Sequence, residues 1–202
     1  MKKRLKYVIV AAVILIVSFL YAHVDKKIPV YDAAADTSLY GNMGVLDAGF
    51  CVTQEFVCER PVLDGVSIKC GTIGSPVTAT YQYQIMDASS GAVLREGTVD
   101  GSLIQNTRYY TIKFEQIEDC LDRELIFTFQ SENASAANAL TIYNVPKGDE
   151  QADLYLNEDE FPGNTLALRT VSHGFDVETF VSVAFCLVYL YLFIKVLYKF
   201  FS

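Results

Sequence analysis

The chain has 202 residues, of which 51% are hydrophobic, and its mean hydropathy is +0.25. Its formal net charge of −8 is unevenly divided, because residues 28–176 carry 8 basic and 22 acidic side chains, a net charge of −14. The negative net charge of residues 28–176 excludes a basic nucleic-acid-binding domain. The many aromatic and β-branched residues of the same segment exclude a disordered acidic tail. The sequence therefore predicts an acidic folded domain between two apolar ends, with no nucleic acid among its partners.

The first apolar end is residues 5–23, in which only Lys6 and His23, at the edges, are ionisable. As a helix this segment spans roughly 28 Å, close to the hydrocarbon thickness of about 30 Å. A cleavable signal peptide is the alternative, but cleavage after Ala22 would put Leu20 where a small residue is required. Residues 1–27 are therefore predicted to be a cytoplasmic tail and an uncleaved transmembrane helix.

The second apolar end is residues 180–197, whose one charge, Lys195, lies near its end. A buried core helix is the alternative, but large apolar residues surround this helix and leave no side for water. Residues 174–202 are predicted to be the second transmembrane helix with a short cytoplasmic end. Ser182, Ala184 and Cys186 would allow close packing against a multi-span membrane partner.

Basic residues near the spans predict the orientation. Lys2, Lys3, Arg4 and Lys6 precede the first span, and Lys195 and Lys199 end the second, whereas only Lys26 and Lys27 oppose them. We therefore expect a two-pass protein of the cell membrane with both termini cytoplasmic and the domain extracytoplasmic.

Between the spans, residues 28–48 show little periodicity and are predicted to be a linker. Alternation of apolar and polar residues begins at about Phe50 and is clearest in residues 78–87, which a turn at 88–91 follows. Eight or nine such segments and no amphipathic helix indicate an all-β antiparallel sandwich, jelly-roll-like, over residues 49–173.

Four cysteines, Cys51, Cys58, Cys70 and Cys120, belong to this domain, and Cys186 belongs to the second span. Outside the cytoplasm the four cysteines of the domain would form two disulfides, for which three pairings are possible. Cys58 and Cys70, on the inward faces of two segments expected to be neighbouring strands, are the first candidate pair. Free thiols are the alternative.

Two acidic runs, residues 118–124 and 158–160, are candidates for a structural Ca²⁺ site, with solvated loops as the favoured alternative. Neither run has the Asp-x-Asp-x-Asp-Gly spacing of a dedicated calcium loop. The domain core contains no histidine, so no Ser-His-Asp set can be assembled, and nothing selects two carboxylates for hydrolysis. We expect no catalytic residue and no cofactor other than that calcium.

Tyrosines give the one indication of a ligand, because flat aromatic rings cover the apolar faces of sugars while amide and charged side chains hold their hydroxyls. Tyr109 points away from the inward residues of its strand and lies next to Asn106 and Arg108, and Tyr143 and Tyr155 lie on short later strands. These five residues are the candidate ligand-binding set. Cross-strand packing is the alternative for the tyrosines.

Residues 50–170 contain six segments in a fixed order. They are a strand with Gln54 and Phe56, residues 63–66, a tyrosine-rich strand ending in Asp87, the return at 91–94, a strand ending in Phe114, and residues 125–133. This order resembles the jelly-roll-like extracytoplasmic β-sandwich of bacterial membrane proteins in cell-surface polysaccharide assembly, including multi-span glycosyltransferases that use lipid-linked sugars. The resemblance implies a sandwich fold and an association with envelope glycans. It transfers no catalytic residue, because those enzymes have many spans and this chain has two.

The sequence thus predicts a non-catalytic, membrane-anchored module that binds or positions glycans, or that supports a membrane complex for cell-envelope polysaccharide assembly. The alternative is an envelope protein–protein interaction or sensor module that recognises a basic partner through its acidic surface.

Overall fold

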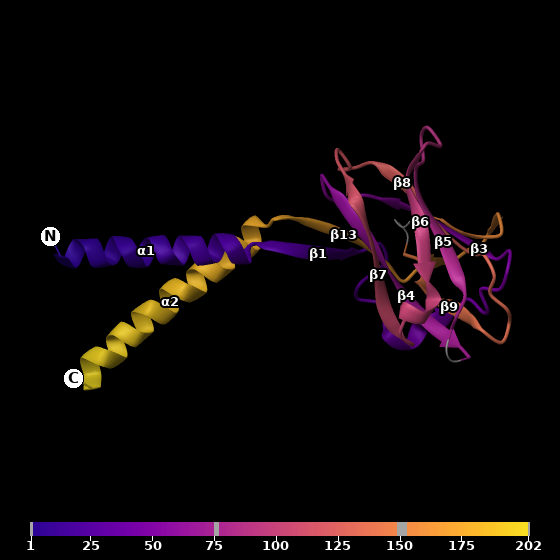
Figure 1. Ribbon diagram of the computed structural model, residues 1–202. Coiled ribbons are helices and arrows are strands. Elements are labelled where there is room, and N and C mark those ends of the chain that lie inside the picture. Colours follow the sequence, from indigo (N-terminus) through magenta and orange to yellow (C-terminus); the bar gives the residue numbers. More distant parts are fainter. Residues whose placement is uncertain (1, 75–76, 149–152, 202) are drawn as a thin grey trace. The chain divides into compact units, whose positions relative to one another are not determined.

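The computed structural model describes residues 2–74, 77–148 and 153–201. The chain divides into two compact units, one made of Met1–Lys26 with His173–Ser202 and the other of Lys27–Ser172 (Figure 1). The first unit carries the two helices and the second carries the β-sheets.

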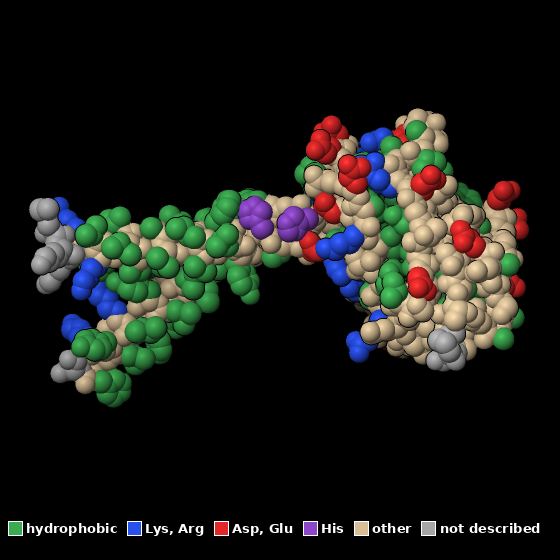
Figure 2. All heavy atoms as spheres, in the orientation of Figure 1, with side chains coloured by type: hydrophobic (Ala, Val, Ile, Leu, Met, Phe, Trp, Pro, Cys, Tyr) green, Lys and Arg blue, Asp and Glu red, His purple; other side chains and the backbone are tan. Residues whose placement is uncertain are grey.

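The helical unit consists of α1 (Lys2–Tyr21) and α2 (Val177–Phe201), and both are long and apolar enough to cross a membrane. Their side chains are almost entirely unburied, as the apolar surface in Figure 2 shows, so neither is a core helix. The two apolar helices predicted at the chain's ends are therefore confirmed, and α2 extends past the expected 180–197 at both ends. Their orientation across a membrane stays a prediction.

The helices touch but leave space between them. A hollow of about 400 Å³ lies between Val10 and Ile14 of α1 and Ala184, Val188 and Tyr191 of α2. Its lining is wholly apolar, which suits lipid chains or another helix better than water.

The second unit contains two antiparallel sheets. The seven-stranded sheet has, in spatial order, β1 (His23–Pro29), β13 (Leu168–Phe175), β4 (Leu63–Ile73), β9 (Ala139–Pro146) and β12 (Asn164–Leu166), with β2 (Gly41–Asn42) on β9 and β7 (Arg108–Ile117) on β4. The six-stranded sheet has β11 (Asp159–Glu160), β10 (Leu154–Leu156), β3 (Cys51–Val57), β8 (Glu124–Ser131), β5 (Thr80–Asp87) and β6 (Val93–Asp100). Two short 3₁₀ helices, η1 (Thr37–Leu39) and η2 (Gly101–Leu103), complete the described elements.

The all-β sandwich with flanking apolar helices is confirmed. In β5 the residues Tyr81, Tyr83 and Ile85 are buried while Gln82 and Gln84 alternate with them, as period-two patterning requires. The described residues form 13 strands, more than the eight or nine expected. The excess comes from strands such as β2 and β11, which at two residues are too short to show a period.

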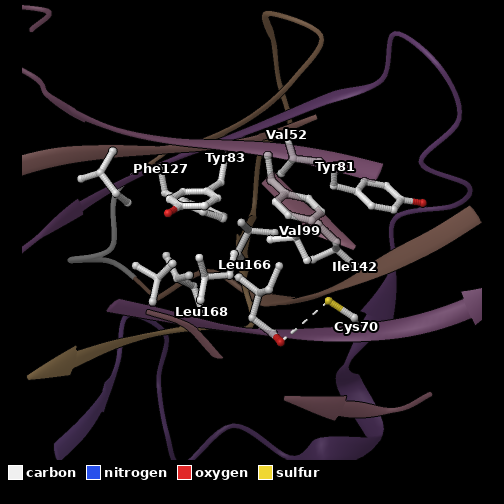
Figure 3. Close-up of a cluster of buried hydrophobic side chains, with 14 of the residues drawn as sticks. Val52, Cys70, Tyr81, Tyr83, Val99, Phe127, Ile142, Leu166 and Leu168 are labelled. Atoms are coloured by element: carbon white, nitrogen blue, oxygen red, sulfur yellow. Dashed lines mark hydrogen bonds between the residues drawn. The ribbon is translucent and has the colours of Figure 1, made fainter. Parts of the chain in front are cut away.

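The core lies between the two sheets, where buried side chains from both meet (Figure 3). Tyr81 of β5 stacks on Phe129 of β8 with ring centroids 5.2 Å apart, and its hydroxyl accepts a hydrogen bond of 2.7 Å from the Leu140 nitrogen of β9. A buried phenol needs such a partner. This bond also ties the six-stranded sheet to the seven-stranded one.

Residues 28–48, expected to be a linker, instead pack against the sandwich. Tyr31 is 4% exposed and Leu46 is fully buried. The Leu46 nitrogen donates to the Leu140 oxygen at 2.9 Å, and β2 pairs with β9. A segment without period can still be ordered when it is tied to a sheet edge.

Candidate functional site

Tyr109 and Tyr143 lie on the outer face of the seven-stranded sheet, within a group that we call the tyrosine–cation cluster: Tyr31, Tyr40, Tyr109, Tyr143, Lys69 and Arg169. The Arg169 guanidinium lies 3.8 Å from the centroid of the Tyr109 ring. The Lys69 ammonium lies 4.5 Å from the ring centroid of Tyr40 and 5.0 Å from that of Tyr143. These cation–π contacts occupy ring faces that a sugar would otherwise cover.

Hydroxyl groups close the same cluster. The Tyr31 and Tyr109 hydroxyl oxygens are 2.5 Å apart, and Arg169 Nη2 donates to the Tyr31 oxygen at 3.1 Å. Burial, with the Tyr31 hydrogen bond, raises the pKa of Tyr109. Burial alone would raise the pKa of Tyr31 too, but hydrogen bonds from Tyr109, Tyr40 and Arg169 outweigh it and lower that pKa. The contacts are those of a packed cluster, with few groups left for a ligand.

Asn106 lies beside this cluster and Arg108 does not. The Asn106 carboxamide oxygen accepts a hydrogen bond from the Thr72 nitrogen at 3.0 Å. A Cβ placed on Gly71 would lie 3.4 Å from both Asn106 Oδ1 and the Tyr143 ring, so the two are neighbours. Arg108 pairs with Cys70 one position along from the Lys69–Tyr109 pair, and it therefore faces the other way. The sequence placed Tyr109 correctly outward but missed its partners.

Tyr155 lies on the other sheet, on a surface that we call the amide face: Thr53, Glu55, Gln82, Gln84, Glu96, Thr98, Thr128, Gln130 and Tyr155. The register pairs Tyr155 with Thr53, Thr53 with Thr128, and Thr128 with Gln84, so these side chains share the outer side of the sheet. The candidate set of five residues is thus divided between two opposite sheets.

Glutamines of adjacent strands are hydrogen-bonded along the amide face. Gln130 Nε2 donates to Gln82 Oε1 at 2.8 Å, and Gln82 Nε2 donates to Glu132 Oε1 at 2.5 Å. Gln84 Nε2 donates to Glu96 Oε2 at 3.2 Å. These bonds orient the carboxamides while each keeps a further donor or acceptor.

A hollow of about 380 Å³ lies at this face, lined by Gln82, Gln84, Glu96 and Thr98 from β5 and β6, together with Tyr83 and Gly97. Tyr83 and Gly97 pair across these strands, between the Gln82–Thr98 and Gln84–Glu96 pairs. A Cβ on Gly97 would lie 2.8 Å from the Tyr83 ring, so the glycine lets that ring pack beneath the sheet. Sequence reasoning missed this site, although the alternation in residues 80–86 had placed both glutamines outward.

The amide face is acidic. The carboxylate of Glu55 is the main cause of the raised pKa of Tyr155, followed by burial and by Asp153 and Glu160. Among the described outward positions of β3, β8 and β5, none is lysine or arginine. Lys147, which also acts on Tyr155, forms an ion pair with Asp153, so a ligand on the central strands of this face would meet hydrogen-bonding groups of neutral and negative charge.

The two acidic runs lie at turns and strand ends. Asp119 and Asp122, between β7 and β8, and Glu158, before β11, have φ values of 54–74°, and Asp159 and Glu160 form β11 itself. Within residues 2–74, 77–148 and 153–201, no three His, Cys, Asp or Glu side chains gather closely enough to hold a metal ion. A structural Ca²⁺ ion at these runs stays a prediction.

The expected pairing of Cys58 with Cys70 rested on neighbouring strands, and this premise is wrong. Cys58 follows β3 in the six-stranded sheet, whereas Cys70 lies on β4 in the other. All five cysteines are thiols in the structure. Cys70 is fully buried in the core near Ile68, and burial raises its pKa to about 12 (Figure 3). Hydrophobic alternation gives the inward direction of a residue but not the sheet to which its strand belongs.

Comparison with known proteins gives little. No family model matches the chain, and no curated protein is similar to it. Among solved structures, the chain is similar to the cysteine protease and lectin-like domains of Cwp84, a surface layer associated protein of Clostridium difficile, with 14% identity and a TM-score of 0.41. The match covers 68% of this chain but only 37% of that one. Such a likeness does not transfer an activity to this chain.

Proposed function

We propose that the β-sandwich is a non-catalytic glycan-binding module, held at the outer side of the cell membrane by α1 and α2, where it positions polysaccharide for a membrane complex that assembles it. The observation that supports this most is the amide face, a sheet surface with ordered carboxamides and a hollow of about 380 Å³.

The chemistry of this face suits sugar hydroxyls, each of which both donates and accepts hydrogen bonds. Carboxamides such as those of Gln82 and Gln84 offer both functions, and Glu96 adds acceptors. Tyr155 stands three strands from β5, a separation of about 14 Å at the usual strand spacing. An extended oligosaccharide lying across the strands would reach from the hollow to that ring.

The charge of the face narrows the ligand class. Glu55, Glu96 and Glu160 would repel an anionic polysaccharide, and they cannot be offset by basic side chains on the central strands. We therefore propose a neutral sugar, or one that carries amino groups.

The test is binding of the full chain, in detergent, to an array of neutral, amino and acidic oligosaccharides, followed by calorimetry on the best ligand. Gln82→Ala and Tyr155→Ala should each weaken binding about tenfold, the loss expected for one or two hydrogen bonds or a stacking contact. Gln105→Ala, an exposed glutamine in the loop before β7, is the matched control and should bind as the wild type does. Retention of no sugar, or equal binding by all variants, would contradict the proposal.

The second candidate is a protein-recognition module, favoured by the carboxylates of Glu55, Asp153 and Glu160 around Tyr155. Such an acidic surface would attract a basic partner, and salt would weaken the attraction steeply. Binding of a basic protein that falls with salt and is lost in Glu55→Gln would support this candidate, whereas salt-insensitive sugar binding would favour the first.

The proposed role in a membrane complex depends on contacts that the helices would make with a partner protein in the membrane. In α2 no described residue is buried, and Ser182 and Cys186 are exposed small residues on it. Small residues let helices approach closely in lipid. Cross-linking in membranes should capture a membrane protein with the wild type, capture less with Ser182→Leu or Cys186→Leu, and be unchanged with the control Phe200→Leu.

A further inference from the structure

Cys58 and Cys120 are 62 positions apart in sequence, yet both belong to the same buried core cluster of the domain. Cys58 directly follows β3, and Cys120 lies in the loop between β7 and β8. Both side chains are fully buried. Burial raises the pKa of both thiols, and each thiol also contributes to the shift of the other, as expected for side chains that lie close together.

Backbone hydrogen bonds hold the two segments together on either side of these thiols. The Cys58 nitrogen donates to the Arg123 oxygen at 3.0 Å, and the Asp122 nitrogen donates to the Cys58 oxygen at 2.8 Å. The Cys120 nitrogen donates to the Pro61 oxygen at 2.9 Å. The approach of the two cysteines is therefore set by continuation of the β3–β8 ladder, and not by side-chain rotation alone.

The loop that carries Cys120 is shaped to point this residue inward. Asp119 and Asp122, on either side of it, have φ values of 54° and 58°, in the left-handed region that non-glycine residues rarely adopt. With both flanking turns formed, the Cys120 thiol reaches the interior and donates to the Ile117 oxygen at 3.4 Å. The Cys58 thiol likewise has a backbone oxygen, that of Arg60, at 3.4 Å.

The other cysteines have different surroundings. Cys51 lies on the outward side of β3, with Thr53 Oγ1 at 3.9 Å. Cys70 is enclosed in the core on the opposite sheet, and its sulfur is 3.8 Å from the Ile68 oxygen. Cys186 lies on α2. Among the described cysteines, only Cys58 and Cys120 contribute to each other's pKa shift.

We propose that Cys58 and Cys120 are the redox pair of this domain and form a disulfide under oxidising conditions. The two S–H bonds break, one S–S bond forms, and two protons and two electrons leave. A disulfide-carrying thiol oxidoreductase accepts them and is reduced to its dithiol, and oxidised glutathione can replace it in vitro. The bond would tie the end of β3 to the β7–β8 loop, and it requires no glycan or partner.

The experiment maps the thiols of the full chain in detergent. One sample is purified without reductant, a second is equilibrated with oxidised glutathione, and both are denatured with N-ethylmaleimide present. Cleavage after glutamate separates Cys51 from Cys58 at Glu55 and releases the peptides 56–59 and 119–124. We expect these two peptides to be joined, with a mass two hydrogen atoms below their sum, and Cys51, Cys70 and Cys186 to carry the label.

A glutathione-treated chain in which both cysteines are labelled, or in which Cys58 is joined to Cys51 or Cys70, would overturn the proposal. If the two peptides are joined only in the glutathione sample, the Cys58–Cys120 pair is supported, but the domain does not lie in an oxidising compartment. This outcome would therefore contradict the proposed extracytoplasmic topology and not the disulfide. As a further readout, reductant should lower the urea midpoint of the wild type and of Cys51→Ser, and leave that of the Cys58→Ser/Cys120→Ser variant unchanged.

Discussion

The side-chain oxygen of Gln54 on β3 accepts a hydrogen bond of 2.8 Å from the backbone nitrogen of Leu166 on β12, and so joins the two sheets. The same oxygen accepts from Thr165 Oγ1 at 3.1 Å, and Gln54 Nε2 donates to the Asp153 oxygen at 3.2 Å. Gln54 is fully buried. A buried amide whose donors and acceptors are satisfied across the interface favours one placement of the sheets over others.

Gln54→Ala should lower the free energy of unfolding by about 3 kcal/mol, because it removes these bonds and leaves the Leu166 nitrogen buried without a partner. The measurement is the urea midpoint of the full chain in detergent, followed by tyrosine fluorescence because the chain has no tryptophan. Gln82→Ala, which truncates an amide on the outer surface, should change stability by less than about 0.5 kcal/mol. Equal effects of the two variants would contradict the role given to Gln54.

Arg169 is expected to stabilise the tyrosine–cation cluster. Arg169→Ala removes both the contact with the Tyr109 ring and the hydrogen bonds to Tyr31, and should cost about 1–2 kcal/mol by the same measurement. Arg169→Lys should recover only part, since an ammonium cannot stack and donate as a planar guanidinium does.

Two controls separate this effect from a general loss of positive charge and from ligand binding. Arg108→Ala, at the exposed start of β7, should leave stability within about 0.5 kcal/mol of the wild type. Arg169→Ala should also retain sugar binding if the amide face is the site. Loss of binding without loss of stability would instead identify the tyrosine–cation cluster as the site.

Asp87 should make the domain sensitive to acid. Ser89, Ser90 and Arg123 donate hydrogen bonds to its carboxylate and hold its pKa well below the ordinary 3.8. A pKa lowered by folding contributes stability above the unfolded-state pKa, and that contribution is lost as the pH falls through the folded-state pKa. Asp87→Asn should therefore unfold at lower urea than the wild type at pH 7, and the gap should narrow progressively below about pH 4.

The matched control for Asp87 is Asp47→Asn, which removes the same charge at an exposed position. It should follow the wild type at both ends of the pH range. A gap for Asp87→Asn that stays constant from pH 7 to pH 2 would show that its carboxylate does not titrate as argued.

The membrane topology is open to a direct test. Reporter fusions at either terminus should be active only as cytoplasmic reporters, and protease added to the outer side of intact cells should cleave within residues 27–172 and leave the helices protected. The physical reason is the basic flank of each span. Substituting Lys2, Lys3, Arg4 and Lys6 by Ser is expected to give a mixture of orientations.

The sandwich was predictable because its long strands are long enough for alternation to be read. β5 and β8 have eight residues each, and their inward sets include Tyr81, Tyr83, Phe127 and Phe129. The sheet membership of a strand was not predictable, because long-range pairing leaves no local pattern. For this reason Cys58 was expected beside Cys70 and is found beside Cys120.

At the candidate site, too, the direction of a side chain was predictable and its long-range contacts were not. The outward direction of Tyr109 followed from its neighbours, but its contacts with Arg169, Tyr31 and their surroundings join residues more than 50 positions apart. The segment 28–48 gave no periodic signal, although Tyr31 and Leu46 are buried. The outward positions of Gln82 and Gln84 on the amide face could be read from the alternation in β5.

The first and last strands of the sandwich are neighbours in one sheet. The Val30 nitrogen donates to the Leu168 oxygen at 2.9 Å, and Thr170 Oγ1 donates to the Ile28 oxygen at 3.4 Å. The chain thus enters the sandwich at β1 and leaves it at β13, at points one strand spacing apart, about 5 Å. Deletion of residues 30–168 and closure with a two-residue turn is therefore expected to leave a small helical hairpin. A different domain whose two ends are adjacent is expected to be accepted at the same position.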